Sequence, residues 1–199
     1  MGASLKILFV HNHYQARSGE AQVYELDRQA AELAGHEVIC YTRHDRELDH
    51  YGPLRRLSLA ARTTWAWDTQ HTLSQMIERE RPDIAHFVNT LPLISPAAFW
   101  TCQRLAVPVV YNVQNYRLAC PAATFLRDGA ICTECPEHGL SRSVRYACFH
   151  DSHAATLAVV MATQIHRTLG TFERAVKAAG SENRRRRPDA RRARHAHRT

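Results

Sequence analysis

The pattern of apolar and polar residues along this chain alternates between two types. Short runs of consecutive apolar residues, which suit buried parallel strands, are separated by longer stretches in which apolar residues recur every three or four positions, as on one face of a helix. The expected strands cover residues 5–10, 36–42, 83–88 and 107–113. The expected helices cover residues 18–35, 53–81, 96–106 and 151–169. This alternation predicts an α/β fold, a Rossmann-like, doubly wound parallel sheet.

Small polar residues, glycine and proline mark the expected helix boundaries. Ser18 and Gly35 bracket the first helix, because serine is a frequent N-cap and glycine a frequent C-terminal cap. Ser95 followed by Pro96 is typical of an N-cap and first helical position. The last helix is expected to start at Asp151 or Ser152.

The net charge of +7 lies almost entirely at the end of the 199-residue chain. Residues 181–199 carry eight arginines and two carboxylates, whereas residues 1–180 have a net charge of +1. We therefore expect a folded domain over residues 1–178 and a basic disordered tail over 179–199. Such a tail attracts phosphates through its charge, but no nucleic-acid-binding fold or stacking motif accompanies it, so no specific nucleic-acid recognition is expected.

The composition also predicts a compartment. No stretch reaches the roughly 18 uninterrupted apolar residues of a membrane span, and the apolar run at the N-terminus is too short for a signal peptide. The predicted localisation is cytoplasmic, where a reducing environment favours thiols or bound metal over disulfides.

Four of the six cysteines lie close together in the sequence, spaced C-x11-C-x2-C-x12-C within an expected insertion at residues 119–150. They are Cys120, Cys132, Cys135 and Cys148. The x2 spacing lets one tight turn present two sulfurs to one ion, and the flanking pair can complete a tetrahedral site, so a structural Zn²⁺ is one interpretation.

Other roles for these cysteines stay open at this point. The four can be small buried thiols, or disulfides formed on purification. Thioredoxin-type redox chemistry is less favoured, because the Cys132–Cys135 pair is not expected to open a helix directly after a strand. The two remaining cysteines, Cys40 in a strand and Cys102 in a helix, are predicted to be core residues.

Several segments of the chain resemble a known family. They read LKILFVHNHY, SGEAQVYELDRQAAELAGHEVICYT, PDIAHFVNTLPLISPAAFW and PVVYNVQNYRLACPAATFLRDGAIC. In this order they resemble the N-terminal domain of family 4 glycosyltransferases, the retaining GT-B enzymes, over about residues 5–172. The resemblance implies an acceptor-side domain of an enzyme that transfers a sugar from a nucleotide-sugar to a hydroxyl acceptor. The composition changes after residue 176, where a donor domain would be expected to follow, so we expect a truncated or frameshifted chain that is active only if something else supplies a donor half.

The resemblance also implies where ligands bind, since ligands of open α/β sheets bind at the carboxyl ends of the strands. The candidate acceptor-binding residues are His11, Asn89, Gln114, Asn115, Tyr116 and Arg117. Ser18, Gly19 and Glu20 form a strand-to-helix turn that can offer backbone N–H groups to a donor phosphate, or can simply be a tight turn. No catalytic residue is assigned, because Gln114 stands where the family pattern has a histidine and an amide cannot exchange protons near neutral pH.

Two classes of function follow. The first is the glycosyltransferase domain, whose partners are a nucleotide-sugar and an acceptor that in this family is often lipid-linked, which implies peripheral membrane contact. The second is a non-catalytic, zinc-stapled Rossmann-like binding module with a basic phosphate-binding tail. A nucleotide-binding oxidoreductase is excluded, because HNHYQARSG does not match G-x-G-x-x-G.

Overall fold

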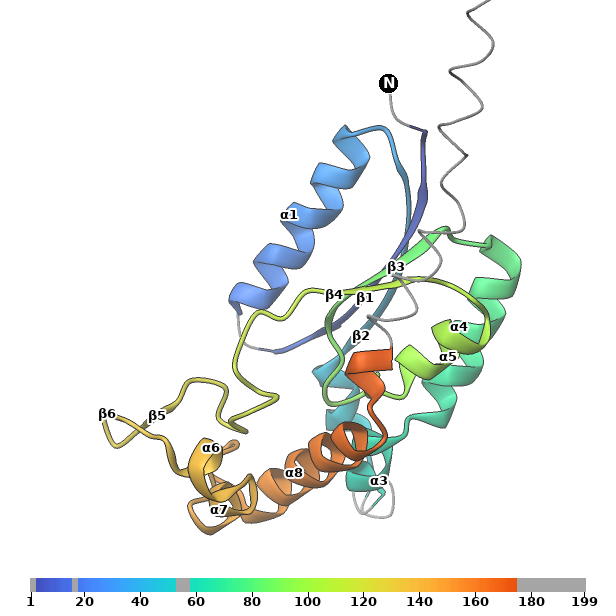
Figure 1. Ribbon diagram of the computed structural model, residues 1–199. Coiled ribbons are helices and arrows are strands. Elements are labelled where there is room, and N and C mark those ends of the chain that lie inside the picture. The colour runs from blue at the N-terminus through green and yellow to red at the C-terminus, as the bar shows by residue number, and fades with distance from the viewer. Residues whose placement is uncertain (1–2, 16–17, 53–57, 175–199) are drawn as a thin grey trace, which may run out of the picture.

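A four-stranded parallel sheet in the order β2-β1-β3-β4 forms the centre of the computed structural model, which describes residues 3–15, 18–52 and 58–174 (Figure 1). The strands are β1 (Lys6–His13), β2 (Glu37–His44), β3 (Ile84–Asn89) and β4 (Val109–Tyr111). The helices around it are α1 (Gly19–Leu33), the 3₁₀ helix η1 (Asp45–His50), α3 (Leu59–Thr64), α4 (Trp67–Glu80), α5 (Ala98–Arg104) and α8 (His153–Thr168). The predicted α/β, Rossmann-like architecture is confirmed.

Helices cover both faces of the sheet because neighbouring residues of a strand point to opposite sides. On one face, Phe9 of β1 packs with Tyr24 of α1. On the other face, Leu8 and Val10 belong to the larger core, which includes Leu73 of α4 and further side chains of α5. A strand buried on both faces needs consecutive apolar residues, which is why the runs in the sequence predicted these strands.

The helix expected over residues 53–81 is interrupted. Residues 53–57 lie outside the described part of the chain; α3 then ends at Thr64 and α4 starts at Trp67. Between them the backbone N–H of Ala66 donates to Ser95 Oγ at 3.1 Å, and the ring of Trp65 stacks on His166 with centroids 5.8 Å apart. These long-range contacts replace the helical hydrogen-bonding pattern at this point.

Ser95 also differs from its expected role as the N-cap of α5. The helix begins at Ala98 with Ala97 in the cap position, and Ser95 adopts a positive φ of 61°. Its hydroxyl accepts from the backbone N–H of Ala97 at 3.3 Å as well as from that of Ala66. Ser95 therefore joins two segments distant in sequence.

The two cysteines expected in the core have different environments. Cys102 of α5 is buried, as predicted. Cys40 is exposed, so that prediction was wrong: it lies on β2, which is an edge strand of the sheet formed by the described residues.

After β4 the chain leaves the sheet and forms a lobe beside α8 (Figure 1). This segment contains the antiparallel hairpin β5 (Leu126–Arg127) and β6 (Ala130–Ile131), followed by α6 (Glu134–His138) and α7 (Ser141–Arg145). The hairpin turn has positive φ at Asp128 and Gly129, as two-residue hairpin turns require. The lobe occupies the region expected to form the insertion at residues 119–150.

Two of the predictions made from charge and hydropathy concern other parts of the chain. The basic tail at 179–199 lies outside the described residues. Within the described ranges, none of the helices has both the length and the apolar character needed to cross a membrane.

Candidate functional site

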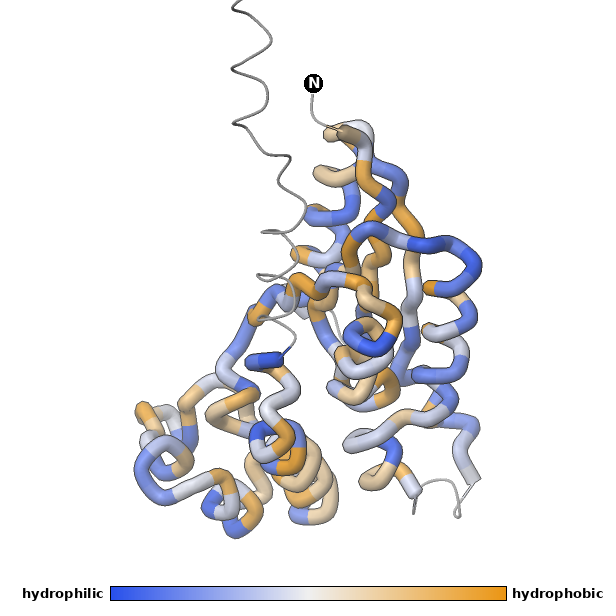
Figure 2. The backbone as a smooth tube through the Cα atoms, turned by 45° about the vertical axis from the view of Figure 1, so that its right-hand side comes forward, coloured by the Kyte–Doolittle hydropathy of each residue, from blue (hydrophilic) through white to orange (hydrophobic). Residues whose placement is uncertain are grey.

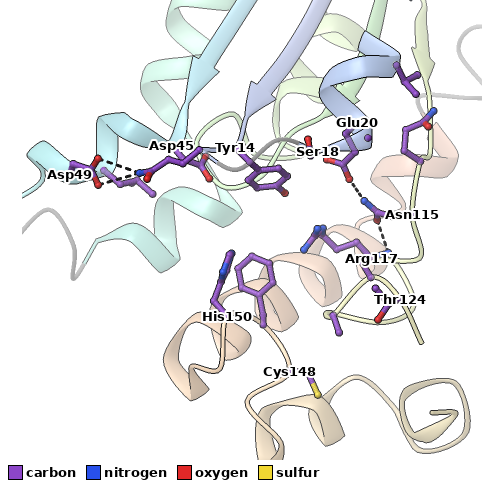
Figure 3. A pocket seen from close by; sticks show the side chains of 18 residues that line it. Tyr14, Ser18, Glu20, Asp45, Asp49, Asn115, Arg117, Thr124, Cys148 and His150 are labelled. Atoms are coloured by element: carbon purple, nitrogen blue, oxygen red, sulfur yellow. Dashed lines mark hydrogen bonds between the residues drawn. The ribbon is translucent and has the colours of Figure 1, made fainter. Parts of the chain in front are cut away.

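A pocket of about 910 Å³ lies at the edge of the sheet where the parallel strands end (Figure 3). Five parts of the chain supply its walls: the loop after β1, the start of α1, η1, the loop after β4, and the segment just before α8. Its polar lining includes Tyr14, Gln15, Ser18, Glu20, Asp45, Asp49, Gln114, Asn115, Arg117, Thr124 and His150. Strand ends meet at one edge of a parallel sheet, so residues distant in sequence converge here.

A hydrogen-bonded cluster joins the N-terminus of α1 to the loop after β4. The side-chain amide of Asn115 donates to Glu20 Oε1, and its Oδ1 accepts from the backbone N–H of Arg117 at 2.9 Å. Glu20 Oε2 is buried and has no hydrogen-bond partner among the described residues. Burial raises the pKa of Glu20, and the Arg117 charge and the Asn115 hydrogen bond oppose that shift. Glu20 thus joins the start of α1 to the loop after β4 through Asn115.

The Arg117 guanidinium occupies the middle of the pocket. Its Cζ lies 5.2 Å from the centroid of the Phe149 ring and 6.0 Å from that of Tyr14. Nη1 donates to the Pro121 carbonyl at 3.4 Å. Figure 3 shows the side chain directed towards Tyr14 and His150. The aromatic contacts orient a cation whose remaining N–H groups can donate to ligand oxygens.

Buried amides support the pocket from beneath. Asn89 Nδ2 donates to the carbonyls of Asn12 and Leu91 at 2.8 and 3.1 Å, and Asn89 Oδ1 accepts from the Leu91 N–H at 3.2 Å. Asn12 in turn donates from Nδ2 to Asp45 Oδ1 at 2.6 Å. Burial raises the pKa of Asp45, with the Asn12 hydrogen bond opposing that shift. This network holds the ends of β1 and β3 and the start of η1 together.

Tyr14 connects this network to the pocket. Its hydroxyl donates to Asn89 Oδ1 at 3.5 Å, and burial raises the pKa of the phenol. The ring therefore stays neutral near physiological pH and presents an aromatic face beside Arg117.

The structure gathers six of the nine residues named from the sequence around the pocket. These are Ser18, Gly19, Glu20, Gln114, Asn115 and Arg117. Ser18 also caps α1, since its Oγ accepts from the Ala21 N–H at 3.3 Å. The Gln114 amide donates to Asn112 Oδ1 beside the pocket.

The other three candidates, His11, Asn89 and Tyr116, are not among the lining residues. Asn89 is buried under the pocket, where it makes the hydrogen bonds to Asn12 and Leu91 described above. It also lines a small adjoining cavity of about 30 Å³. Tyr116 is 61% exposed and packs its ring on Phe125 with centroids 4.9 Å apart. It anchors the segment that leads into the lobe.

His11 is completely buried and stacks on Tyr24 with ring centroids 4.7 Å apart. Neither ring nitrogen has a hydrogen-bond partner in the described part of the chain. Burial lowers the pKa of His11 to about 3, with the neighbouring His13 adding to the shift. The ring is thus a neutral component of the core near pH 7.

The sequence reasoning did not name Tyr14, Asp45 or His150, all of which line the pocket. Tyr14 directly follows β1 and Asp45 directly follows β2. The rule that ligands bind at the carboxyl ends of the strands, here called the strand-end rule, would have found both if it had been applied to every strand. His150 had no comparable signal, because the lobe brings it back to the sheet from a distant part of the sequence.

Cys132 directly follows β6, and Cys135 is the second residue of α6, so the pair lies after a strand and at the start of a helix. The expectation that the pair lacks a strand–helix context was therefore wrong. Burial raises the pKa of Cys135, and the neighbouring thiols add to that shift.

A sequence model of a family described as Glycosyltransferase Family 4 matches residues 19–118, which is half of the chain. The matched region runs from the start of α1 to just beyond Arg117, so it contains the hydrogen-bonded cluster of Glu20, Asn115 and Arg117. No curated protein and no solved structure matches the chain.

Proposed function

Because the chain belongs to glycosyltransferase family 4, we propose that its pocket is the acceptor side of a sugar-transfer site. In this proposal the pocket binds a hydroxyl acceptor, and a nucleotide-sugar held by a donor-binding domain supplies the sugar. The observation that carries it is the cluster of Glu20, Asn115 and Arg117 at the carboxyl ends of the strands, within the matched region.

The chemistry of the lining suits a polyhydroxylated ligand. Glu20, Asp45 and Asp49 offer carboxylate oxygens that accept from hydroxyl groups, and Arg117 donates to ligand oxygens. The rings of Tyr14 and Phe149 add apolar faces on which the C–H face of a sugar can pack. Specificity would come from these few fixed polar groups, while the aromatic faces supply buried area.

The turn at Ser18, Gly19 and Glu20 supports a second contact, with a donor phosphate. It begins a 15-residue helix, whose N-terminal N–H groups attract anions, and a Cβ placed at Gly19 would meet no atom within 4 Å. The Glu20 carboxylate opposes a phosphate there, whereas the Arg117 guanidinium favours it. We propose that the positive charge of Arg117 offsets the negative charge of Glu20 when the acceptor and the donor phosphate are both bound.

Saturation-transfer NMR on the full chain tests this function, with a panel of monosaccharides and disaccharides and with UDP- and GDP-sugars as probes. We expect saturation of sugar-ring protons and its loss in Arg117→Ala. Arg104→Ala is the matched control, because Arg104 is an arginine of α5 that donates to Ser74, and it should keep the wild-type signal.

Two results contradict the proposal. One is the absence of sugar signals from the wild-type protein across the panel. The other is a signal that Arg117→Ala leaves unchanged, which would place carbohydrate binding elsewhere. The alternative of a binding module with a basic phosphate-binding tail gains no support here, since that tail lies outside the described residues.

A further inference from the structure

Four cysteines from separate parts of the lobe line one small cavity of about 10 Å³. Cys120 lies in the loop after β4, Cys132 follows β6, Cys135 lies in α6 and Cys148 follows α7. Cys120 is buried, the other three are half-buried, and all four are free thiols. The fold therefore brings together sulfurs that are up to 28 positions apart in the sequence.

The lobe buries few apolar side chains, among them Cys120 and Leu140. Within the described residues, the segment 119–150 adds no residue to either hydrophobic core cluster of the protein. Leu126 and Ile131 pair across the hairpin, yet they are 55% and 83% exposed. Figure 2 shows the tube through this lobe alternating between hydrophilic and hydrophobic residues. A segment of this length with so little buried apolar surface needs another source of folding free energy.

A half-buried arginine lies beside the thiols. Arg127 lines the same cavity, and its guanidinium lies over the Tyr146 ring with Cζ 3.8 Å from the centroid. Arg127 Nε lies 3.8 Å from Asp128 Oδ2, and Nη1 is buried without a hydrogen-bond partner in the described ranges. A metal ion with four thiolates carries a net charge of −2, which this cation would complement.

The side-chain rotamers do not yet form a coordination sphere. Among residues 3–15, 18–52 and 58–174, no group of three or more histidine, cysteine, aspartate or glutamate side chains is arranged to hold a metal ion as it stands. Zinc needs its sulfur ligands at about 2.3 Å. A change of χ1 between staggered rotamers moves a cysteine sulfur by a few ångströms, which is enough to converge within so small a cavity.

We propose that Cys120, Cys132, Cys135 and Cys148 bind one structural Zn²⁺ as four thiolates, with release of their protons. The ion would occupy the cavity between the hairpin, α6 and α7, and Arg127 would lie beside its sulfur ligands. Four sulfur ligands complete a tetrahedral sphere, so the site has no open position for catalysis.

The proposed site has a consequence for the pocket and does not depend on the proposed function. Cys148 lines both the thiol cavity and the pocket, and Phe149 and His150 follow it directly in the pocket wall. Figure 3 shows Cys148 at the base of that wall. A metal ion bound by Cys148 would therefore hold the aromatic contact of Phe149 with Arg117 in place.

The test uses the full chain, purified and reduced without oxygen, and titrated with Co²⁺ as a spectroscopic substitute for Zn²⁺. We expect the strong visible bands of a tetrahedral thiolate complex to saturate at about one Co²⁺ per chain and to disappear when Zn²⁺ is added. Cys135→Ser should lose these bands, whereas Cys40→Ser, which removes an exposed thiol of β2, should keep them.

A second measurement covers the case in which Cys135→Ser does not fold. Titration of the zinc-loaded wild-type protein with a mercurial should release zinc in step with modification of the four thiols. The proposal is overturned by the absence of tetrahedral bands in the wild-type protein, by full metal binding in a folded Cys135→Ser variant, or by zinc release without thiol modification.

Discussion

Substitution of Asn89 can show whether this residue has a structural role or a ligand-binding role. Its side chain donates to the carbonyls of Asn12 and Leu91 and accepts from the Leu91 N–H, and all of these groups are buried. Asn89→Ala would leave those backbone groups without partners. At about 1 kcal/mol for each lost bond, we expect a loss of about 3 kcal/mol in the free energy of unfolding.

Urea unfolding followed by circular dichroism measures this loss. With a denaturant slope of about 2 kcal/mol/M, the urea midpoint should fall by about 1.5 M in Asn89→Ala. Asn115→Ala is the matched control: it removes the same kind of side chain from the pocket wall, where it binds Glu20 and the Arg117 N–H. We expect it to shift the midpoint by less than about 0.5 M, since the group is partly exposed, and to abolish sugar binding.

The combination of results decides between the two roles. If Asn89→Ala unfolds within about 0.5 kcal/mol of the wild-type protein, the buried network does not hold the strand ends, and the reasoning is refuted. If Asn89→Ala keeps its stability but loses carbohydrate binding, Asn89 is a ligand residue, as the sequence had predicted.

Two further predictions concern buried groups. In the unfolded chain His11 binds a proton below about pH 6.5, whereas in the folded protein it stays neutral until about pH 3. His11 therefore does not lower the free energy of unfolding at neutral pH, but lowers it progressively as the pH falls. From about pH 7 to pH 4.5 the wild-type protein should lose about 2–3 kcal/mol more stability than His11→Phe, and equal losses in urea melts would contradict this. Thr171 accepts from Trp100 Nε1 at 2.9 Å and contacts His166 Nδ1 at 2.9 Å. Thr171→Val should cost about 1–3 kcal/mol in the same melts, and a loss below about 0.5 kcal/mol would show that this bridge does not matter.

The order of strands and helices could be read from the sequence because it depends on local patterns. Residues 7–10 form a continuous apolar run, and β1 is found around it at Lys6–His13, since a strand buried on both faces needs apolar residues at successive positions. The helix expected over residues 53–81 could not be predicted correctly, because its break depends on a hydrogen bond from Ala66 to the distant Ser95.

The pocket was predictable only in part. The strand-end rule located Gln114, Asn115 and Arg117, because the ends of parallel strands meet at one edge of the sheet. It could not tell that His11 faces Tyr24 in the core, since neighbouring strand residues point to opposite faces and helix packing decides which face is buried.

The cysteines show the same division most clearly. Their spacing alone indicated that four thiols of residues 119–150 belong together, because two sulfurs separated by two residues can share one turn. Only the tertiary structure placed Cys120 and Cys148 beside that pair, and only it placed Cys148 in the wall of the pocket. Spacing constrains which groups can meet locally, whereas the path of a loop back to the sheet depends on packing between residues distant in the sequence.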